Sequence, residues 1–276
     1  MILPTTGFAE AVETMSTEAL RREFLAGGLF VPGEVRYRWW EVDRTVLGGI
    51  VPTDRPLELF NPDALRSDTF LERREVGVIN VGGPGSIRAD GVEYSMGNLD
   101  GLYLGRGVKS VMLTARSTEN PAKFWLLSYP AHVSYATRHI LHATVVGDRL
   151  GARETANERT LYKYFHPGSL QTCQLVMGLT RLEPGNVWNS MPPHTHMRRS
   201  EVYLYFNLQP GHVVFHFMGQ PRTTRNLVVR DLEAVLSPPW SIHCGAGTSH
   251  YSFIWGMGGE NQVFADMDPA PLAELR

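Results

Sequence analysis

Short apolar runs separated by turn-forming residues extend along the chain from Arg36 onward. The runs are rich in Val, Ile, Leu, Phe, Tyr and Trp, and Gly, Pro, Asn and Asp separate them at a spacing of roughly ten residues. This pattern is typical of all-β sandwiches and barrels, so the predicted fold class is all-β. The expected strands cover residues 37–42, 76–82, 86–96, 101–105, 110–115, 123–129, 142–147, 161–166, 173–182, 201–206, 212–219, 225–230, 233–239, 251–257 and 262–267.

One short amphipathic helix is expected before the strands, from Ser16 to Gly27. A serine is a favourable N-cap, and Leu20, Phe24 and Leu25 share one face of a helix that begins there. Glycine at the far end suits a helix terminus. Helical periodicity is scarce in the rest of the chain.

The most polar stretch, residues 136–160, has few bulky apolar residues in its second half. We interpret it as the link between two β-rich halves, residues 1–150 and 151–276. All ten histidines lie between His132 and His250, so a histidine-based metal site is expected in the second half. The first half is expected to lack metal ligands and to be structural or to contact substrate.

Composition and charge predict a globular protein that binds neither nucleic acid nor membranes. The chain has 276 residues, 43% hydrophobic and 20% charged, which suits a globular fold with a full core. A net charge of −2 gives little attraction for nucleic acid or anionic membranes, so neither is expected as a partner. Residues 1–15 lack the basic and apolar regions of a signal peptide. The two cysteines, Cys173 and Cys244, are too few for the disulfide framework of a secreted protein. We expect a cytoplasmic protein.

The strongest chemical motif is MPPHTHMRRSEVYLYF, residues 191–206. His194 and His196 are two residues apart, so on a strand both imidazoles project from the same face. Glu201 follows across a short turn, and His243 lies at the end of a later strand. Three imidazoles and one carboxylate suit Zn²⁺, Mn²⁺ or Fe²⁺, and a buried strand with these groups would otherwise hold costly unpaired polar atoms.

The same motifs resemble a known family. HTHMRRSEVYLYF and PWSIHCGAGTSHYSF resemble the cupin metal-binding signature. Together with VGVINVGGPG, LYLGRG, LYKYFHPG and CQLVMGLTRLEPGNVWN, they are similar to the 5-dehydro-4-deoxy-D-glucuronate isomerase family (4-deoxy-L-threo-5-hexosulose-uronate ketol-isomerase). The resemblance runs from about residue 40 to the C-terminus and is much more specific than the HxHx4E pattern of cupins in general.

The resemblance implies two cupin-like jelly-roll halves, one zinc ion in the C-terminal half and a homohexamer. Its metal ligands fall on His194, His196, Glu201 and His243, the set that the spacing favours. The implied reaction is an aldose–ketose isomerisation of a deoxyuronate, part of the bacterial breakdown of pectin-type uronates. Two alternatives stay open: the related 5-deoxyglucuronate isomerase of inositol catabolism, and a cupin that binds a sugar acid without turnover.

The acid–base and substrate-binding residues are less constrained by the sequence. An isomerase must remove a proton from C2, return one at C1 and hold the carboxylate of its substrate. Arg199 and His166 are expected to bind substrate, although Arg199 could instead face outward at a subunit contact. The candidates for proton transfer are Lys163, Tyr205 and Glu260, and His166 and Tyr203 are further possibilities. The two tyrosines could equally be interior packing residues.

Overall fold

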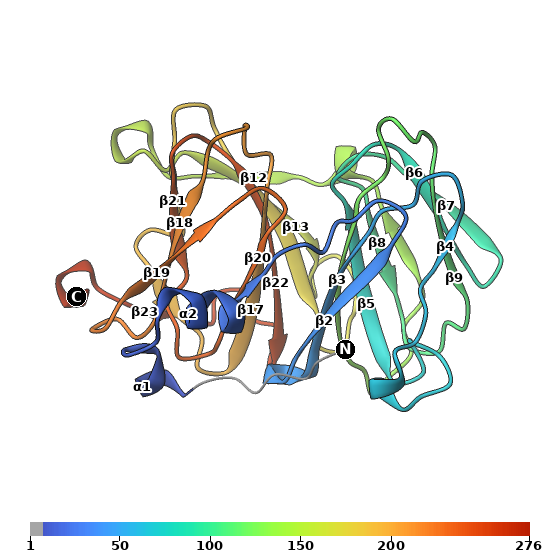
Figure 1. The fold of residues 1–276 in the computed structure, drawn as a ribbon, viewed down its shortest axis with the longest axis horizontal. Coiled ribbons are helices and arrows are strands. Elements are labelled where there is room, and N and C mark those ends of the chain that lie inside the picture. The colour runs from blue at the N-terminus through green and yellow to red at the C-terminus, as the bar shows by residue number, and fades with distance from the viewer. Residues whose placement is uncertain (1–7) are drawn as a thin grey trace. The chain divides into compact units, whose positions relative to one another are not determined.

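The apolar runs form antiparallel sheets throughout residues 8–276, the part of the chain that the computed structural model describes (Figure 1). Residues 1–7 lie outside the described residues. They belong to residues 1–15, in which the sequence predicts no signal peptide. The described chain divides into two compact units. Of the described residues, the first unit contains 28–145 and 164–176, and the second contains 8–27, 146–163 and 177–276. The sequence predicts one boundary between residues 150 and 151, whereas each compact unit is made of segments that are separate in the sequence.

The first unit is built from two sheets. The six-stranded sheet has the order β11-β8-β5-β10-β3-β2, with β11 (Arg138–Ile140), β8 (Gly101–Leu104), β5 (Arg74–Asn80), β10 (Phe124–Pro130), β3 (Thr45–Ile50) and β2 (Val35–Trp40). The four-stranded sheet has the order β4-β9-β6-β7, with β4 (Leu57–Glu58), β9 (Val111–Ala115), β6 (Gly85–Ala89) and β7 (Val92–Met96). Val46 and Val78 of one sheet and Ile87 and Leu113 of the other belong to one buried apolar core. Apolar side chains therefore fill the space between these sheets.

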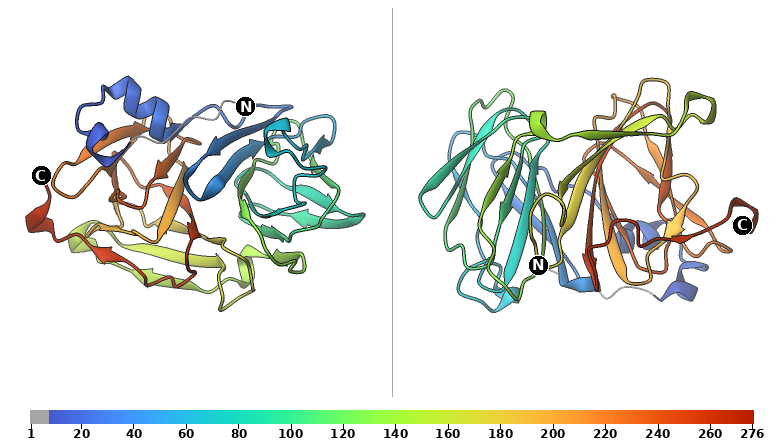
Figure 2. Two further views of the ribbon diagram at one scale, coloured as in Figure 1. Left: turned by 90° about the horizontal axis from the view of Figure 1, so that it is seen from below. Right: turned by 180° about the vertical axis from the view of Figure 1, so that it is seen from behind.

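The second unit also has two main sheets. The seven-stranded sheet has the order β1-β20-β17-β22-β14-β13-β12, with β1 (Leu25–Ala26), β20 (Ala234–Ser237), β17 (Arg199–Phe206), β22 (Ser252–Gly259), β14 (Val176–Leu182), β13 (Arg159–Phe165) and β12 (Gly147–Leu150). The four-stranded sheet has the order β15-β21-β18-β19, with β15 (Trp188–Asn189), β21 (Cys244–Gly247), β18 (Val214–Met218) and β19 (Arg225–Val229). A short pair, β16 (His194–Thr195) and β23 (Asp268–Pro269), completes the unit. Figure 2 shows the sheets of each unit from two further directions.

The helix expected from Ser16 forms but is shorter than predicted. After α1 (Ala9–Val12), α2 spans Thr17–Phe24, and the Ser16 hydroxyl accepts a hydrogen bond of 3.2 Å from the backbone N of Ala19. The helix does not reach Gly27, because residues 25–26 pair with β20 as strand β1. Within residues 8–276, no helix has the length and apolar character needed to cross a membrane.

The all-β prediction is confirmed, with local corrections. The expected strand 142–147 is wrong except at its last residue, because His142–Thr144 form a 3-10 helix and strand β12 begins only at Gly147. The expected strand 262–267 is a turn in which the backbone N of Asp266 donates to the carbonyl of Val263. Further 3-10 helices lie at Val42–Arg44, Asp63–Leu65, Arg153–Thr155 and Leu272–Glu274.

Candidate metal centre

The four predicted ligands come from three neighbouring segments of the second unit. His194 begins β16, His196 follows β16, and the backbone N of His196 donates to the carbonyl of Pro239 at 3.2 Å. Glu201 lies on β17, directly opposite Ser237 of β20. His243 immediately precedes β21. Strand pairing thus brings residues more than forty positions apart to one place.

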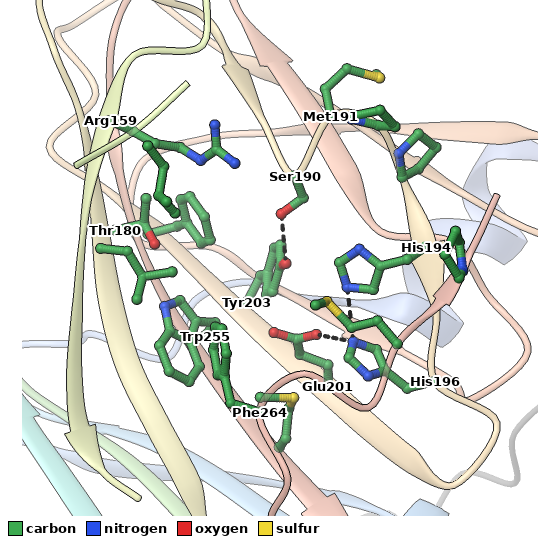
Figure 3. A pocket seen from close by; sticks show the side chains of 18 residues that line it. Arg159, Thr180, Ser190, Met191, His194, His196, Glu201, Tyr203, Trp255 and Phe264 are labelled. Atoms are coloured by element: carbon green, nitrogen blue, oxygen red, sulfur yellow. Dashed lines mark hydrogen bonds and ion pairs between the residues drawn. The ribbon is translucent and has the colours of Figure 1, made fainter. Parts of the chain in front are cut away.

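The four ligand atoms converge tightly; Figure 3 shows three of these residues, His194, His196 and Glu201. The Nε2 atom of His194 lies 3.0 Å from Nε2 of His196 and 3.0 Å from Nε2 of His243. The Oε2 atom of Glu201 lies 3.2 Å from Nε2 of His196 and 2.9 Å from Nε2 of His243. All four ligand atoms lie within 4.8 Å of one another, and among residues 8–276 these residues make the one such cluster of His, Cys, Asp and Glu.

These residues fit a divalent cation. Three ring nitrogens that point at one another cannot all be satisfied by hydrogen bonds, because a neutral imidazole carries a single N–H. The Nδ1 atom of His196 lies 3.1 Å from the carbonyl of Asp266, and Nδ1 of His243 lies 3.2 Å from Oγ of Ser237. Protons on these Nδ1 atoms would leave the Nε2 lone pairs free at the centre, as in histidine ligands of metals.

The charges of the cluster agree with this interpretation. Burial alone would raise the pKa of Glu201, but His243 and His196 outweigh burial and hold the pKa of this carboxyl well below its usual range. Glu201 is therefore a carboxylate at neutral pH. Burial, together with His243 and His196, lowers the pKa of His194 far below that of a free histidine, so His194 is a neutral imidazole. A carboxylate and neutral imidazoles are the protonation states in which these groups bind metals.

A cavity of about 370 Å³ opens beside the cluster, in the second unit. Its volume falls within the range of small-molecule sites. His194, His196 and Glu201 line one part of the cavity, and most of the remaining wall is apolar, including Phe253 and Trp255. Polar side chains are few in the rest of the wall: Arg159, Thr180, Ser190 and Tyr203 (Figure 3).

Tyr203 follows Glu201 by two positions on β17 and so faces the same side of the sheet, as the alternation predicted. Its hydroxyl lies 3.1 Å from Oγ of Ser190, a residue that the sequence did not single out. Burial, with the nearby charge of Glu201, raises the pKa of Tyr203 well above its ordinary value. Tyr203 therefore keeps its proton at neutral pH and offers a hydrogen bond at the cavity wall.

Tyr205 lies deeper in the same unit and is not among the residues that line the cavity. Its hydroxyl lies 2.7 Å from Nδ1 of His216 on β18 and accepts from Nδ2 of Asn189 at 3.4 Å. All three residues are buried. This network connects the two sheets behind Tyr203.

Arg199 is buried on the outer side of the ligand cluster. Its Nη2 atom donates to the carbonyl of Asp266 at 2.6 Å and lies 3.0 Å from Nδ1 of His196, the ring nitrogen that faces away from the other ligands. Only 1% of Arg199 is exposed, and it does not line the cavity. The neighbouring Arg198 forms ion pairs with Asp266 and Asp268 and so fastens this segment beside His196.

The other predicted residues lie outside the cavity wall. Lys163 forms an ion pair of 2.9 Å with Asp148 and places its ammonium group over the ring of Phe264. Glu260 donates its backbone N–H to the carbonyl of Arg198. His166 accepts a hydrogen bond at Nδ1 from the backbone N of Gly168. Their proposed roles in catalysis or substrate binding stay predictions.

Arg159 is the charged residue of the cavity wall that the sequence interpretation missed. It lies in the polar stretch 136–160, which resembled a linker. In the structure it begins β13 and pairs with Leu150 of β12. The sequence offers one indication of its direction. Arg159 precedes the apolar Leu161 by two residues, and on a strand this spacing places both side chains on the same face.

Comparisons with known proteins show which family of sequences this chain is similar to. A sequence model of the KduI/IolB family matches residues 40–271. Two curated relatives bear the name 4-deoxy-L-threo-5-hexosulose-uronate ketol-isomerase. The relative from Halalkalibacterium halodurans is 49% identical over 267 residues, covering 97% of both chains. The relative from Lachnoclostridium phytofermentans is 48% identical over 276 residues, covering 100% of both chains.

A solved structure shares the fold at low sequence identity. An IolB-like protein from Salmonella typhimurium superposes with a TM-score of 0.72 at 15% identity, covering 87% of this chain and 94% of that one. At this identity the likeness concerns the fold alone. The expected all-β, cupin-like architecture is thus confirmed.

Proposed function

The chain belongs to the KduI/IolB family, and we propose that it isomerises 4-deoxy-L-threo-5-hexosulose-uronate, the compound in the names of its curated relatives. This compound, 5-dehydro-4-deoxy-D-glucuronate, becomes 3-deoxy-D-glycero-2,5-hexodiulosonate in the catabolism of pectin-type uronates. The protein is an intramolecular oxidoreductase of the aldose–ketose isomerase type, acting in the cytoplasm. The observation that carries the proposal is the ligand cluster in the wall of a cavity of small-molecule size.

The reaction is balanced within the substrate. A carbonyl moves from C1 to C2 through an enediol. A proton leaves C2 and one arrives at C1, the C2 hydroxyl loses its proton and the C1 oxygen gains one, and the electron pair of the broken C–H bond stays in the substrate. His194, His196, Glu201 and His243 would hold one divalent ion. The donor set suits Zn²⁺, Mn²⁺ or Fe²⁺, and among these we infer Zn²⁺ from the resemblance to the isomerase family. When bound, the ion supplies Lewis-acid polarisation of the substrate carbonyl.

The chain's own residues have separate tasks in this scheme. Tyr203 keeps its phenolic proton, so it donates a hydrogen bond to the substrate oxygen on which negative charge develops. Ser190, 3.1 Å from that hydroxyl, fixes its orientation. The apolar wall around them displaces bulk water, which strengthens these polar contacts.

Among the tyrosines, the cavity favours Tyr203 over Tyr205 for direct contact with substrate, because only Tyr203 lines it. Lys163 and Glu260 also stand outside the wall, so a proton-transfer role for either would require substrate to reach beyond the cavity. Arg199 contacts the Asp266 carbonyl and the outer face of His196, which favours a positioning role.

We further propose that the protein assembles as a hexamer, which its resemblance to the isomerase family implies. Large apolar side chains of the second unit are open to solvent in the single chain, among them Val146 at 87% and Val263 at 60% exposure. Light scattering should give a mass six times the 30.9 kDa of one chain. A monomer at micromolar concentration would contradict this part of the proposal.

The function is tested by assaying purified, metal-loaded protein on two substrates, 5-dehydro-4-deoxy-D-glucuronate and 5-deoxyglucuronate, with NMR identification of each product. We expect turnover of the first, with loss of the aldehyde signal and formation of the 2,5-diulosonate. Faster turnover of 5-deoxyglucuronate would assign the chain to the inositol-catabolic reaction. No turnover of either compound would leave a sugar-acid-binding protein without catalysis.

A further inference from the structure

Apart from the metal ligands, one charged side chain lines the cavity. Among the 18 lining residues that Figure 3 draws, Arg159 and Glu201 are the only Arg, Lys, Asp or Glu side chains, and Glu201 belongs to the ligand cluster. Most of the wall is formed by Leu, Met, Pro and aromatic side chains. Figure 3 shows Arg159 on one side of the cavity and His194 and His196 on the other.

Strand geometry explains why Arg159 faces the cavity. Arg159 and Leu161 are two positions apart on β13, so their side chains project from the same face of the sheet. Leu150, the partner of Arg159 on β12, lines the cavity as well. The intervening Thr160 instead bonds Glu183. The orientation of Arg159 is therefore fixed by the sheet.

The guanidinium group of Arg159 has no counter-ion among residues 8–276. Its Nη1 atom donates to the carbonyl of Asn157 at 2.8 Å, and no carboxylate of the described chain forms an ion pair with Arg159. Burial is the main influence on Arg159 and lowers its pKa, yet a guanidinium stays charged at neutral pH. A partly buried cation in an apolar wall is costly without an anion, so the site is electrostatically incomplete.

The contact with Asn157 also orients the Arg159 side chain before any anion binds. The Asn157 side-chain oxygen accepts from the backbone N of Ala152 at 3.0 Å and from the Thr155 hydroxyl at 2.9 Å, which fixes the loop before β13. The Asn157 carbonyl then holds one nitrogen of Arg159. An arginine restrained in this way loses little conformational entropy when an anion binds.

We propose that Arg159 binds the carboxylate of the substrate and thereby makes the cavity specific for sugar acids. The inference rests on the proposed function, since it places the carboxylate at Arg159 and the isomerised carbonyl at the ligand cluster across the cavity. Arginine suits this task because its planar group matches a carboxylate with two parallel hydrogen bonds. Arg199, the arginine expected from the sequence, is already bonded to Asp266 on the outer side of His196.

The test compares three variants: Arg159→Met, Arg159→Lys and, as a matched control, Arg181→Met, which removes an exposed arginine from β14. Binding is measured by calorimetry with D-gluconate and D-sorbitol. These six-carbon probes differ in one terminal carboxylate, and neither has a carbonyl to isomerise. Metal content and melting temperature are recorded for every variant, so that a folding defect is recognised.

We expect wild-type protein and Arg181→Met to bind gluconate more tightly than sorbitol by on the order of 10- to 100-fold, the value of one charge-assisted contact. Arg159→Met should abolish this preference, and Arg159→Lys should retain part of it. In the isomerase assay, KM for the uronate should rise by a similar factor in Arg159→Met, with a smaller change in kcat.

Two outcomes separate this inference from the proposed function. If the uronate is not isomerised but the gluconate preference depends on Arg159, the carboxylate site stands and the function fails. If the uronate is isomerised while Arg159→Met keeps both its KM and its gluconate preference, the function stands and the role of Arg159 is wrong. An equal loss in Arg181→Met would also overturn the inference, because the effect would not be specific to the cavity.

Discussion

Two ligands of the candidate metal centre, His196 and His243, are oriented by contacts on the sides of their rings that face away from the cluster. His196 is held through Nδ1 by the Asp266 carbonyl, which also accepts from the buried Arg199. His243 is held through Nδ1 by Ser237 on β20. Such outer contacts fix the ring orientation and the free nitrogen of a ligand histidine. The affinity of the site should therefore depend on these partners as well as on the ligands.

Glu201→Gln should lower the bound metal and the isomerase rate together. The amide is similar in size but neutral, so it removes the anionic oxygen that lies 2.9 Å from His243. We expect metal affinity to fall at least tenfold, measured by competition with a chromogenic chelator. His212→Ala, which removes a histidine bonded to Thr248 away from the cluster, is the control. Equal metal content in Glu201→Gln and the wild type would remove Glu201 from the ligand set.

Tyr203→Phe should reduce kcat while metal content stays normal. The change deletes only the hydroxyl that faces the cavity next to Ser190, and loss of one donor to a developing oxyanion costs on the order of 100-fold in rate. Tyr205→Phe is the matched comparison, because it deletes a hydroxyl bonded to His216 outside the cavity wall. A larger loss of kcat in Tyr205→Phe than in Tyr203→Phe would restore Tyr205 as the catalytic tyrosine.

Cys244 should resist thiol reagents at mildly alkaline pH. Burial raises the pKa of its thiol to about 12, so at pH 8 the reactive thiolate is scarce, and it increases only as the pH approaches 12. In Cys173→Ser, a disulfide reagent at pH 8 should label almost no thiol in native protein and one per chain after denaturation. Rapid labelling of the native variant would show that Cys244 is accessible.

At the scale of elements, strand β17 organises the second unit. It pairs with β20 on one side and β22 on the other, and it carries Glu201, Tyr203 and Tyr205 on its inner face. The sequence predicted this face because polar and aromatic residues alternate with Val202 and Leu204. In a regular strand, side chains alternate between the two faces, so the sequence alone predicts which residues point inward.

The N-cap of α2 offers a test at the same scale. Ser16→Ala removes the hydroxyl that accepts from the Ala19 backbone N, which should lower the free energy of unfolding by about 1 kcal/mol. Chemical denaturation followed by circular dichroism measures the change. Ser16→Asp should keep most of the stability, because a carboxylate also caps a helix N-terminus. Equal stability of Ser16→Ala and the wild type would show that the cap contributes nothing.

The missed or misplaced elements have physical causes that only the folded chain reveals. Strand β3 contains Gly48 and Gly49, which broke the apolar pattern; a side chain at Gly49 would lie 2.6 Å from the carbonyl of Leu29, so close packing explains this glycine. The expected strand at 142–147 turns because His142 is fixed by Asp100 through its backbone and by Tyr164 through its ring. These are contacts between distant segments.

The same reasoning explains which site residues could be predicted. The ligands His194, His196 and Glu201 follow from spacing within one motif, His243 follows from its place near the end of a later strand, and the family resemblance falls on the same four residues. Arg159 could not be found this way, because its face depends on the pairing of β12 with β13 inside a stretch that is polar on average. The role expected of Arg199 came from its sequence position, whereas its contacts lie behind His196.

At the scale of the whole molecule, the two units have different interiors. Apolar side chains fill the space between the sheets of the first unit, whereas the second unit contains the buried ligand cluster and its cavity. One metal ion per chain is expected from this difference. The four ligands come from segments that are distant in sequence, so a bound ion cross-links the second unit.

Metal removal should therefore lower the melting temperature. An ion that binds only the folded state stabilises it by about 4 kcal/mol when its free concentration is a thousand times the Kd. Calorimetry of metal-loaded and chelator-treated protein should show a lower transition after chelation, restored by adding Zn²⁺. Glu201→Gln should show a much smaller difference between the two states. A transition unaffected by chelation would contradict a metal bound among these strands.

The most direct test of the central claim is a titration of metal-free protein with Zn²⁺, in which the isomerisation of 5-dehydro-4-deoxy-D-glucuronate is followed by NMR. The cluster of His194, His196, Glu201 and His243 predicts a rate that rises linearly and reaches its plateau at one ion per chain. Full activity of the metal-free protein, or a plateau at two ions per chain, would contradict the proposal that one metal centre supports the reaction.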